Sequence, residues 1–285
     1  MKNNNSHVTT RFSLLHKQFA TLTFAAIAVF GAAFSIPANA RDTEATRKPA
    51  TVFQVSTLPA LSLGLYDGTM SFGEVLQHGD FGVGTFHALD GEGIILDGKV
   101  WRVRSDGRVF SVGKKEMTPF AVVTNFEPDH VIKIKEPLEY SALLAKILSV
   151  LPTPNAPYAI EVRGTFGRIK VRSVPGQQKP YPPLSEVVKT QSEWEWEGVK
   201  GNLVGFRFPS YLSGVNLADN HFHFISDDKK RGGHLLNCEL QSGQIRIQTI
   251  RGFDMELPKT KEFDQLNLSA DQSATLKAAE SAGKK

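Results

Sequence analysis

The chain has 285 residues, 41 % of them apolar, which is enough for one large domain or two small ones. Three basic and no acidic residues lie in the first 40 positions, so the remainder carries 30 basic and 29 acidic side chains and a net charge of +1. A remainder this close to neutrality gives no argument for nucleic acid or an anionic membrane surface as a partner. The single cysteine, Cys238, excludes an intrachain disulfide, and its apolar surroundings predict a small buried residue.

The first 40 residues are typical of a secretory signal peptide. Basic residues precede an apolar run at 19–36, and an Ala-x-Ala cleavage signature follows at 38–40. We predict that residues 1–40 are removed, that the protein is exported to the periplasm or the medium, and that no stable membrane anchor remains. An uncleaved anchor is the alternative, because the run is nearly long enough to span a bilayer. The polar residues 41–51 are predicted to form a flexible leader.

From Val52 onward, short β-type runs separated by turn residues predominate. The clearest hairpin joins Gly93–Leu96 to Lys99–Arg104 through Asp97-Gly98. Apolar residues at helical spacing predict a helix over Ser141–Leu151, before Pro152. Other predicted strands are 52–57, 81–88, 109–112, 120–126, 131–135, 158–174 (broken at Gly164 and Gly167), 187–196, 203–208, 214–226, 234–240 and 244–253, with helices at 69–77 and 270–280.

A proline-rich stretch at 174–184 divides these elements. A weak internal similarity between residues 84–101 and 205–222 suggests two related halves. We therefore predict an α+β fold with two packed β-sheet lobes, mixed or antiparallel, and a few short helices. The expected N-terminal lobe is 52–180, and the expected C-terminal lobe, with a metal-binding hairpin and a terminal helix, is 181–285.

Three of the eight histidines lie within fourteen residues, in NHFHFISDDKKRGGHLL. On a strand, His221 and His223 point to one face, and a polar loop at 227–233 returns His234 on a neighbouring strand. Three imidazoles suit Zn²⁺ and other divalent ions, and leave a position open for water or substrate. We predict a catalytic metal site on the C-terminal lobe, facing the cleft. Buried histidines that serve packing alone are the alternative, and the cluster by itself does not choose a reaction.

Residues Gly79–Arg102, GDFGVGTFHALDGEGIILDGKVWR, resemble α-acetolactate decarboxylases. The histidine segment and KVRSVPGQQKPYPPL at 170–184 also look like segments of that family, in the same order, and the resemblance extends from about Val52 to the C-terminal helix. It implies decarboxylation of (2S)-2-acetolactate to (R)-acetoin and CO₂. It also implies zinc, or another divalent ion, on His221, His223 and His234, no organic cofactor and a small molecule as the partner. The sequence allows a homodimer.

The resemblance also implies four residues around the substrate. Glu92 in LDGE, Arg172 in KVRSVPGQ and Glu280 near the C-terminus match catalytic positions of the family, and Thr85 matches a pocket position. Loss of CO₂ from a β-keto acid leaves an enediolate, whose charge a cation stabilises. Arg172 would pair with the substrate carboxylate, Glu92 would handle the proton, and Glu280 would assist it.

Two other classes of function remain open. A cupin-like metal-dependent dioxygenase also carries His-x-His on a strand, but the usual glutamate a few residues later is missing, and Asp227 and Asp228 occupy that region. A periplasmic metal-binding protein without enzymatic activity would normally show a histidine-rich low-complexity loop, which this sequence lacks. A sugar-binding module is the other non-enzymatic alternative. Formation of acetoin from acetolactate distinguishes the main hypothesis from both.

Overall fold

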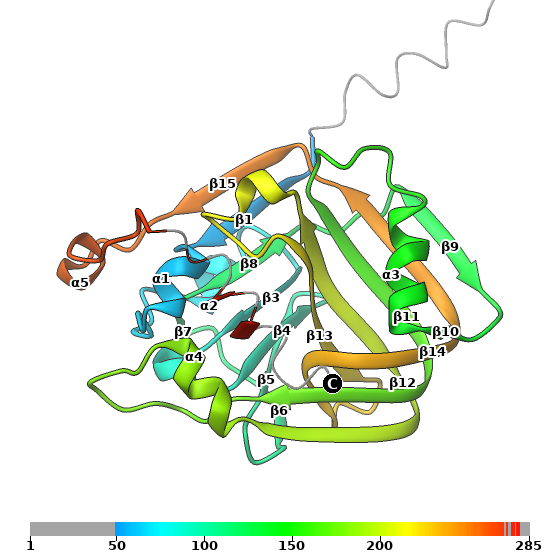
Figure 1. Ribbon diagram of the computed structural model, residues 1–285, viewed down its shortest axis with the longest axis horizontal. Coiled ribbons are helices and arrows are strands. Elements are labelled where there is room, and N and C mark those ends of the chain that lie inside the picture. The colour runs from blue at the N-terminus through cyan, green and yellow to red at the C-terminus, as the bar shows by residue number, and fades with distance from the viewer. Residues whose placement is uncertain (1–48, 271, 273–274, 277, 280–285) are drawn as a thin grey trace, which may run out of the picture. The chain divides into compact units, whose positions relative to one another are not determined.

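Two β-sheets packed against each other make up most of the computed structural model, which describes residues 49–270, 272, 275, 276, 278 and 279 (Figure 1). The predicted signal peptide, most of the predicted leader and Glu280 lie outside the described residues. Contacts group Lys48–Lys285 into one unit. Among the helices described, none combines the length and the apolarity that crossing a bilayer requires.

The first sheet has seven strands in the order β15-β1-β8-β3-β4-β5-β6. All neighbours in it are antiparallel except β1 and β15, which are parallel. The strands are β1 (Thr51–Val55), β3 (Phe81–Thr85), β4 (Glu92–Leu96), β5 (Lys99–Val103), β6 (Val109–Ser111), β8 (Ala121–Thr124) and β15 (Gly252–Glu256). A separate pair joins β2 (Met70–Ser71) to β7 (Met117–Thr118).

The second sheet has six strands, all antiparallel, in the order β10-β14-β11-β12-β13, with β9 also paired to β14. Because β13 pairs with β14 as well, strands β11 to β14 close on themselves at one end. Their bounds are β9 (His130–Ile134), β10 (Leu138–Glu139), β11 (Tyr158–Ser173), β12 (Ser192–Phe208), β13 (Asp219–Ser226) and β14 (Gly232–Thr249). The predicted mixed sheets with few short helices are thus present.

The core lies on both sides of each sheet, because alternate side chains point to opposite faces. Ile94 on β4 and Phe206 on β12 belong to the apolar cluster between the two sheets. Ile95 faces a smaller cluster behind the first sheet, and Leu203 faces the cluster under α3. The short helices are α1 (Leu58–Ser62), α2 (Phe72–Val75), α3 (Tyr140–Leu148), α4 (Leu184–Val187) and α5 (Lys261–Asp264), with 3₁₀ turns at His87–Leu89, Val188–Thr190 and Ser210–Leu212.

Several local predictions are confirmed. The Asp97-Gly98 turn joins β4 to β5, and Cys238 is fully buried. α3 covers most of the helix predicted at 141–151, beginning one residue earlier, with Leu143 and Ile147 buried. The helix predicted at 69–77 shortens to α2, which Ser71 caps together with Glu74. At the C-terminal segment, the described residues 275, 276, 278 and 279 are helical.

The glycines at which strands were predicted to break lie within continuous strands instead. Gly164 on β11 is in register with Gly201 on β12 and Gly243 on β14, so three glycines lie side by side. A β-carbon at Gly164 would come within 2.2 Å of the Ser242 carbonyl oxygen. The glycines therefore permit close approach of the backbones, and β14 runs through the gap predicted between residues 240 and 244.

The structure does not divide at the predicted lobe boundary. Residues 180 and 181 fall between β11 and β12, which pair along nearly their whole lengths in one sheet. β15, from the end of the chain, pairs with β1 from its beginning. The predicted strand at 187–196 also differs, because α4 and a 3₁₀ turn fill 184–190 and β12 begins at Ser192. Each sheet thus combines strands from both sides of the boundary.

Candidate metal centre and substrate pocket

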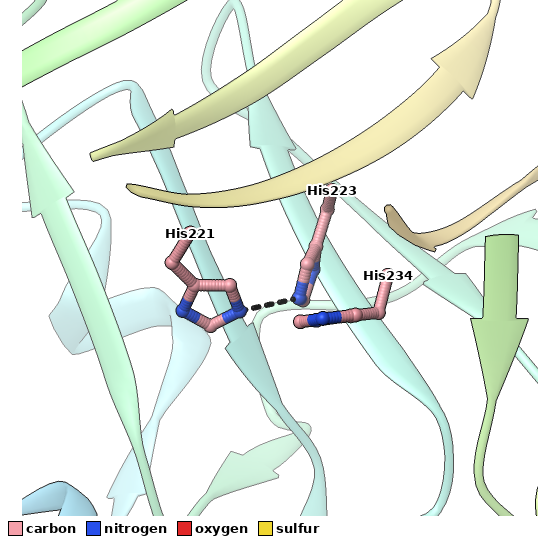
Figure 2. A group of neighbouring side chains, drawn as sticks. All are labelled: His221, His223 and His234. Atoms are coloured by element: carbon pink, nitrogen blue, oxygen red, sulfur yellow. Dashed lines mark hydrogen bonds between the residues drawn. The ribbon is translucent and has the colours of Figure 1, made fainter. Parts of the chain in front are cut away.

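Three buried histidines converge from β13 and β14 (Figure 2). His223 on β13 is the direct register partner of His234 on β14. His221 lies two residues before His223, on the same face of β13. One ring nitrogen from each histidine lies within 4.8 Å of the others. Phe222 and Phe224 point the opposite way, into the cluster under α3. The predicted convergence of the three rings is confirmed.

The orientation of the rings suits a divalent cation. The Nδ1 atom of His223 lies 2.8 Å from the carbonyl oxygen of Gly93, and a carbonyl only accepts, so Nδ1 carries the proton. Its Nε2 therefore presents a lone pair toward the cluster, 3.2 Å from Nε2 of His221. Nitrogen ligands with an outer hydrogen bond of this kind are typical of metal-binding histidines. The three side chains could thus hold a metal ion, and the structure does not identify which one.

Glu92 and Arg172 lie beside the histidines. Glu92 begins β4 in the first sheet, and one carboxylate oxygen is 3.5 Å from Nε2 of His223. Its other oxygen is 3.7 Å from Nη1 of Arg172. Arg172 lies on β11, where it is the register partner of His234 on β14. The side chains of Arg172 and Glu92 are only 3 % and 9 % exposed. Two residues implied by resemblance, 80 positions apart, thus flank one cluster, one with an acidic and one with a basic side chain.

Thr85 is the register partner of Glu92 across β3 and β4. Its hydroxyl donates a 2.8 Å hydrogen bond to the carbonyl oxygen of Gly91, within the turn that leads to Glu92. Thr85 therefore lines the pocket and also ties down the segment that carries Glu92. Glu280 lies outside the described residues, so its predicted place beside the site stays a prediction.

A small cavity of about 40 Å³ connects these groups. Its polar lining residues include Thr85, Glu92, Arg172 and the three histidines. Its apolar lining residues were not predicted, and are Leu58, Leu61, Leu89, Phe120, Val174 and Leu184. These residues come from α1, α4, a 3₁₀ turn and two loops, so no local pattern in the sequence groups them. The pocket thus combines charged and apolar lining residues.

The pocket lies where the two sheets face each other. Thr85 and Glu92 come from the seven-stranded sheet, and Arg172 and the histidines come from the six-stranded sheet. The prediction put the metal site on a C-terminal lobe. The histidines do come from late strands, but their sheet includes β9, β10 and β11 from the earlier part of the chain. The site is therefore assembled by sheet packing rather than by one lobe.

Comparisons with known proteins agree on one family. The family model described as α-acetolactate decarboxylase matches residues 52–270. An α-acetolactate decarboxylase from Methylococcus capsulatus is 43 % identical, over 80 % of this chain and 88 % of its own length. One from Methanosarcina mazei is 41 % identical, over 80 % of each chain. The crystal structure of the Bacillus subtilis α-acetolactate decarboxylase superposes with a TM-score of 0.79 at 36 % identity, covering 81 % of this chain and 99 % of that one.

Proposed function

The chain belongs to the α-acetolactate decarboxylase family, and on that premise we propose that it converts (2S)-2-acetolactate to (R)-acetoin and CO₂. The proposal depends chiefly on one observation, the meeting of Glu92 and Arg172 with three converging histidines around one small pocket. The family relationship favours a decarboxylase over the cupin-like and non-enzymatic alternatives. The enzyme is accordingly a carbon–carbon lyase.

We propose that His221, His223 and His234 hold Zn²⁺ or another divalent ion, without an organic cofactor. Three neutral nitrogen ligands leave both positive charges of the ion uncompensated and leave room for oxygen ligands. When bound, the ion supplies positive charge that stabilises negative charge on a substrate oxygen as CO₂ departs. The Gly93 carbonyl holds His223 in the tautomer that such binding needs.

Substrate binding and proton transfer are assigned to two ionisable residues of the pocket. Arg172 is buried, and its guanidinium can donate two parallel hydrogen bonds to a carboxylate, so it orients the substrate by its acidic end. Decarboxylation leaves an enediolate that must take a proton on one face. Glu92 also lines the pocket and, in its protonated carboxylic acid form, is the proposed proton donor, which takes a new proton from solvent after each turnover. Glu280 is proposed as its partner on sequence resemblance alone.

The apolar side of the pocket fits the two methyl groups of acetolactate. Leu58, Leu61 and Leu184 can contact these groups and keep water away from the reacting atoms. Water exclusion strengthens the electrostatic effect of Arg172, because its field is screened less in a dry site. The division of the cavity into a polar and an apolar side thus matches the two ends of the proposed substrate.

The proposal is tested with the purified mature protein and racemic acetolactate. We expect acetoin to form, mainly as one enantiomer, and its formation to stop after dialysis against a chelator and to return when Zn²⁺ is added. The control is spontaneous decarboxylation in the same buffer, which gives both enantiomers. If acetoin forms no faster than in this control at any metal concentration, the proposed function is wrong.

We further propose that the protein is exported, as the signal-like sequence of residues 1–40 suggests. Cell fractionation with an antibody, together with N-terminal sequencing of the product, tests this point. A mature N-terminus near Arg41 is expected. Retention of the full chain in the membrane fraction would favour the uncleaved anchor instead. The homodimer that the sequence allows stays a prediction, which light scattering of the purified protein can test.

A further inference from the structure

The turn that leads into Glu92 has an unusual backbone. It connects β3 to β4, and three of its residues have positive φ angles: Ala88 at 59°, Leu89 at 56° and Gly91 at 92°. Only Gly91 lacks a β-carbon, so Ala88 and Leu89 adopt the left-handed region at a cost in free energy. Two such residues in succession persist only where surrounding contacts impose them. The residue between Leu89 and Gly91 is Asp90, and it is not part of the metal site.

Asp90 is anchored by two arginines. Arg104 forms a bidentate ion pair with Asp90, in which Nε lies 3.1 Å from one carboxylate oxygen and Nη2 lies 3.0 Å from the other. Arg102 approaches the second oxygen at 3.4 Å and also binds Glu116 at 2.6 Å. The guanidinium of Arg102 lies 3.9 Å from the centre of the Phe86 ring. The Asp90 and Arg102 side chains are 19 % and 11 % exposed, so solvent screens their ion pair less than an ordinary surface pair, whereas Arg104 and Glu116 are 39 % and 43 % exposed.

The same network lies directly behind the catalytic segment. Arg102 is on β5, where it is the register partner of Gly93, the residue that follows Glu92. The Gly93 carbonyl orients His223, and the Gly91 carbonyl accepts the hydroxyl of Thr85. A shift of the turn would therefore move the carboxylate of Glu92 and the hydrogen-bond partners of two other pocket residues together.

The turn also meets the segment that follows Arg172. The backbone N–H of Gln177 donates a 2.7 Å hydrogen bond to the carbonyl oxygen of Ala88. A β-carbon at Gly176 would lie 3.2 Å from Cβ of Asp90, so the backbone at Gly176 packs closely against the Asp90 side chain. Asp90 thus lies at the point where the segment carrying Glu92 in the first sheet and the segment carrying Arg172 in the second sheet come into contact.

We propose that Asp90 is a positioning residue for the decarboxylation, acting through Glu92 and Gly93 rather than on the substrate. Its ion pairs stabilise the strained turn, and the turn determines the position of the Glu92 carboxylate relative to the three histidines. The short aspartate side chain matters, because a longer one would press against Gly176. This inference rests on the proposed function, since it assigns a role within the same reaction.

The test compares Asp90→Asn with Asp254→Asn. Asp254 lies on β15, is exposed and does not line the pocket. For Asp90→Asn we expect kcat to fall by about 10- to 100-fold, since a displacement near 1 Å costs about that much, while KM changes less than about threefold. The enantiomeric purity of acetoin should fall as well, because the proton donor is displaced. Asp254→Asn should match the wild type in all three.

Loss of folded protein alone would give a different result. A partly unfolded population lowers kcat per total protein but leaves KM and enantiomeric purity, corrected for spontaneous acetoin, unchanged. Should Asp90→Asn not fold, Arg104→Gln removes only the fork and keeps Arg102, and it should show the same changes to a smaller extent. The inference would be overturned if folded Asp90→Asn and folded Arg104→Gln kept both the kcat per folded molecule and the enantiomeric purity of the wild type. A wild-type protein that makes no acetoin would overturn the proposed function instead.

Discussion

Replacing Glu92 by glutamine removes a carboxylate and leaves the shape of the side chain unchanged. In the structure, the two carboxylate oxygens lie 3.5 Å from Nε2 of His223 and 3.7 Å from Nη1 of Arg172, and the side chain is only 9 % exposed. An amide fits the same space but does not donate a proton to the enediolate as a carboxylic acid does. We therefore expect Glu92→Gln to fold, to keep its histidine cluster, and to lose most of its turnover.

The size of the loss follows from the role assigned to Glu92. A positioned general acid typically contributes about 10²- to 10⁴-fold to a rate, which corresponds to about 3–5 kcal/mol of barrier. Glu92→Asp provides a second estimate from geometry. It keeps the acid but draws the carboxylate back by one carbon–carbon bond, about 1.5 Å. A misplacement of that size costs on the order of 10²-fold, so both variants should be slow for different reasons.

The assay is acetoin formation under saturating acetolactate, normalised to bound metal measured by elemental analysis. Glu195→Gln is the matched control, because Glu195 lies on β12, is exposed and does not line the pocket. We expect that control to retain full turnover, and both Glu92 variants to bind metal. Turnover of Glu92→Gln within threefold of the wild type would refute the assignment of Glu92 as the proton donor.

Four further predictions follow from the site and the core. His223→Ala should weaken Zn²⁺ binding by more than about 100-fold in equilibrium dialysis, because loss of an outer hydrogen bond alone costs about 10- to 100-fold, whereas His130→Ala, at a partly exposed histidine outside the cluster, should bind normally. Arg172→Lys should lower kcat/KM by about 10- to 100-fold through loss of a forked contact worth about 1.5–3 kcal/mol, and an unchanged kcat/KM would contradict its pairing with the substrate. Burial, aided by the nearby negative charge of Glu139, raises the pKa of the Cys238 thiol from 9.0 to about 12, so a thiol dye at pH 9 should label the unfolded chain only. The thiol of Cys238 loses its proton at a lower pH in the unfolded chain than in the folded one. Its ionisation should therefore lower the free energy of unfolding as pH rises from about 9 to 12, and denaturant titrations of Cys238→Ala should not show this decrease. Phe166→Ala, at a fully buried ring that meets Phe224 edge to face, should lower the free energy of unfolding by about 3–5 kcal/mol, and a loss below 1 kcal/mol would contradict the packing.

Local patterns in the chain predict the histidine cluster well. The alternation of strand side chains places His221 and His223 on one face, and the polar loop makes His234 the partner of His223. The same kind of short-range information identifies the β4–β5 hairpin and α3. Local patterns fail at Gly164, where a residue that often ends strands instead allows three strands to approach closely. The side chains that decide this outcome lie on other strands.

The sequence by itself determined the metal-binding hairpin and, through long motifs, the family to which the chain belongs. Both depend on residues close together in the chain, where backbone geometry limits the outcome to a few forms. Only the tertiary structure decided that Glu92 and Arg172 meet at His223, that six apolar residues from α1, α4 and three other segments line the pocket, and that Asp90 pairs with two arginines behind it. The contacts of Glu92 with Arg172 and His223 join residues 80 or more positions apart. They exist because two sheets bury their apolar faces against each other, and no local pattern specifies how those faces align.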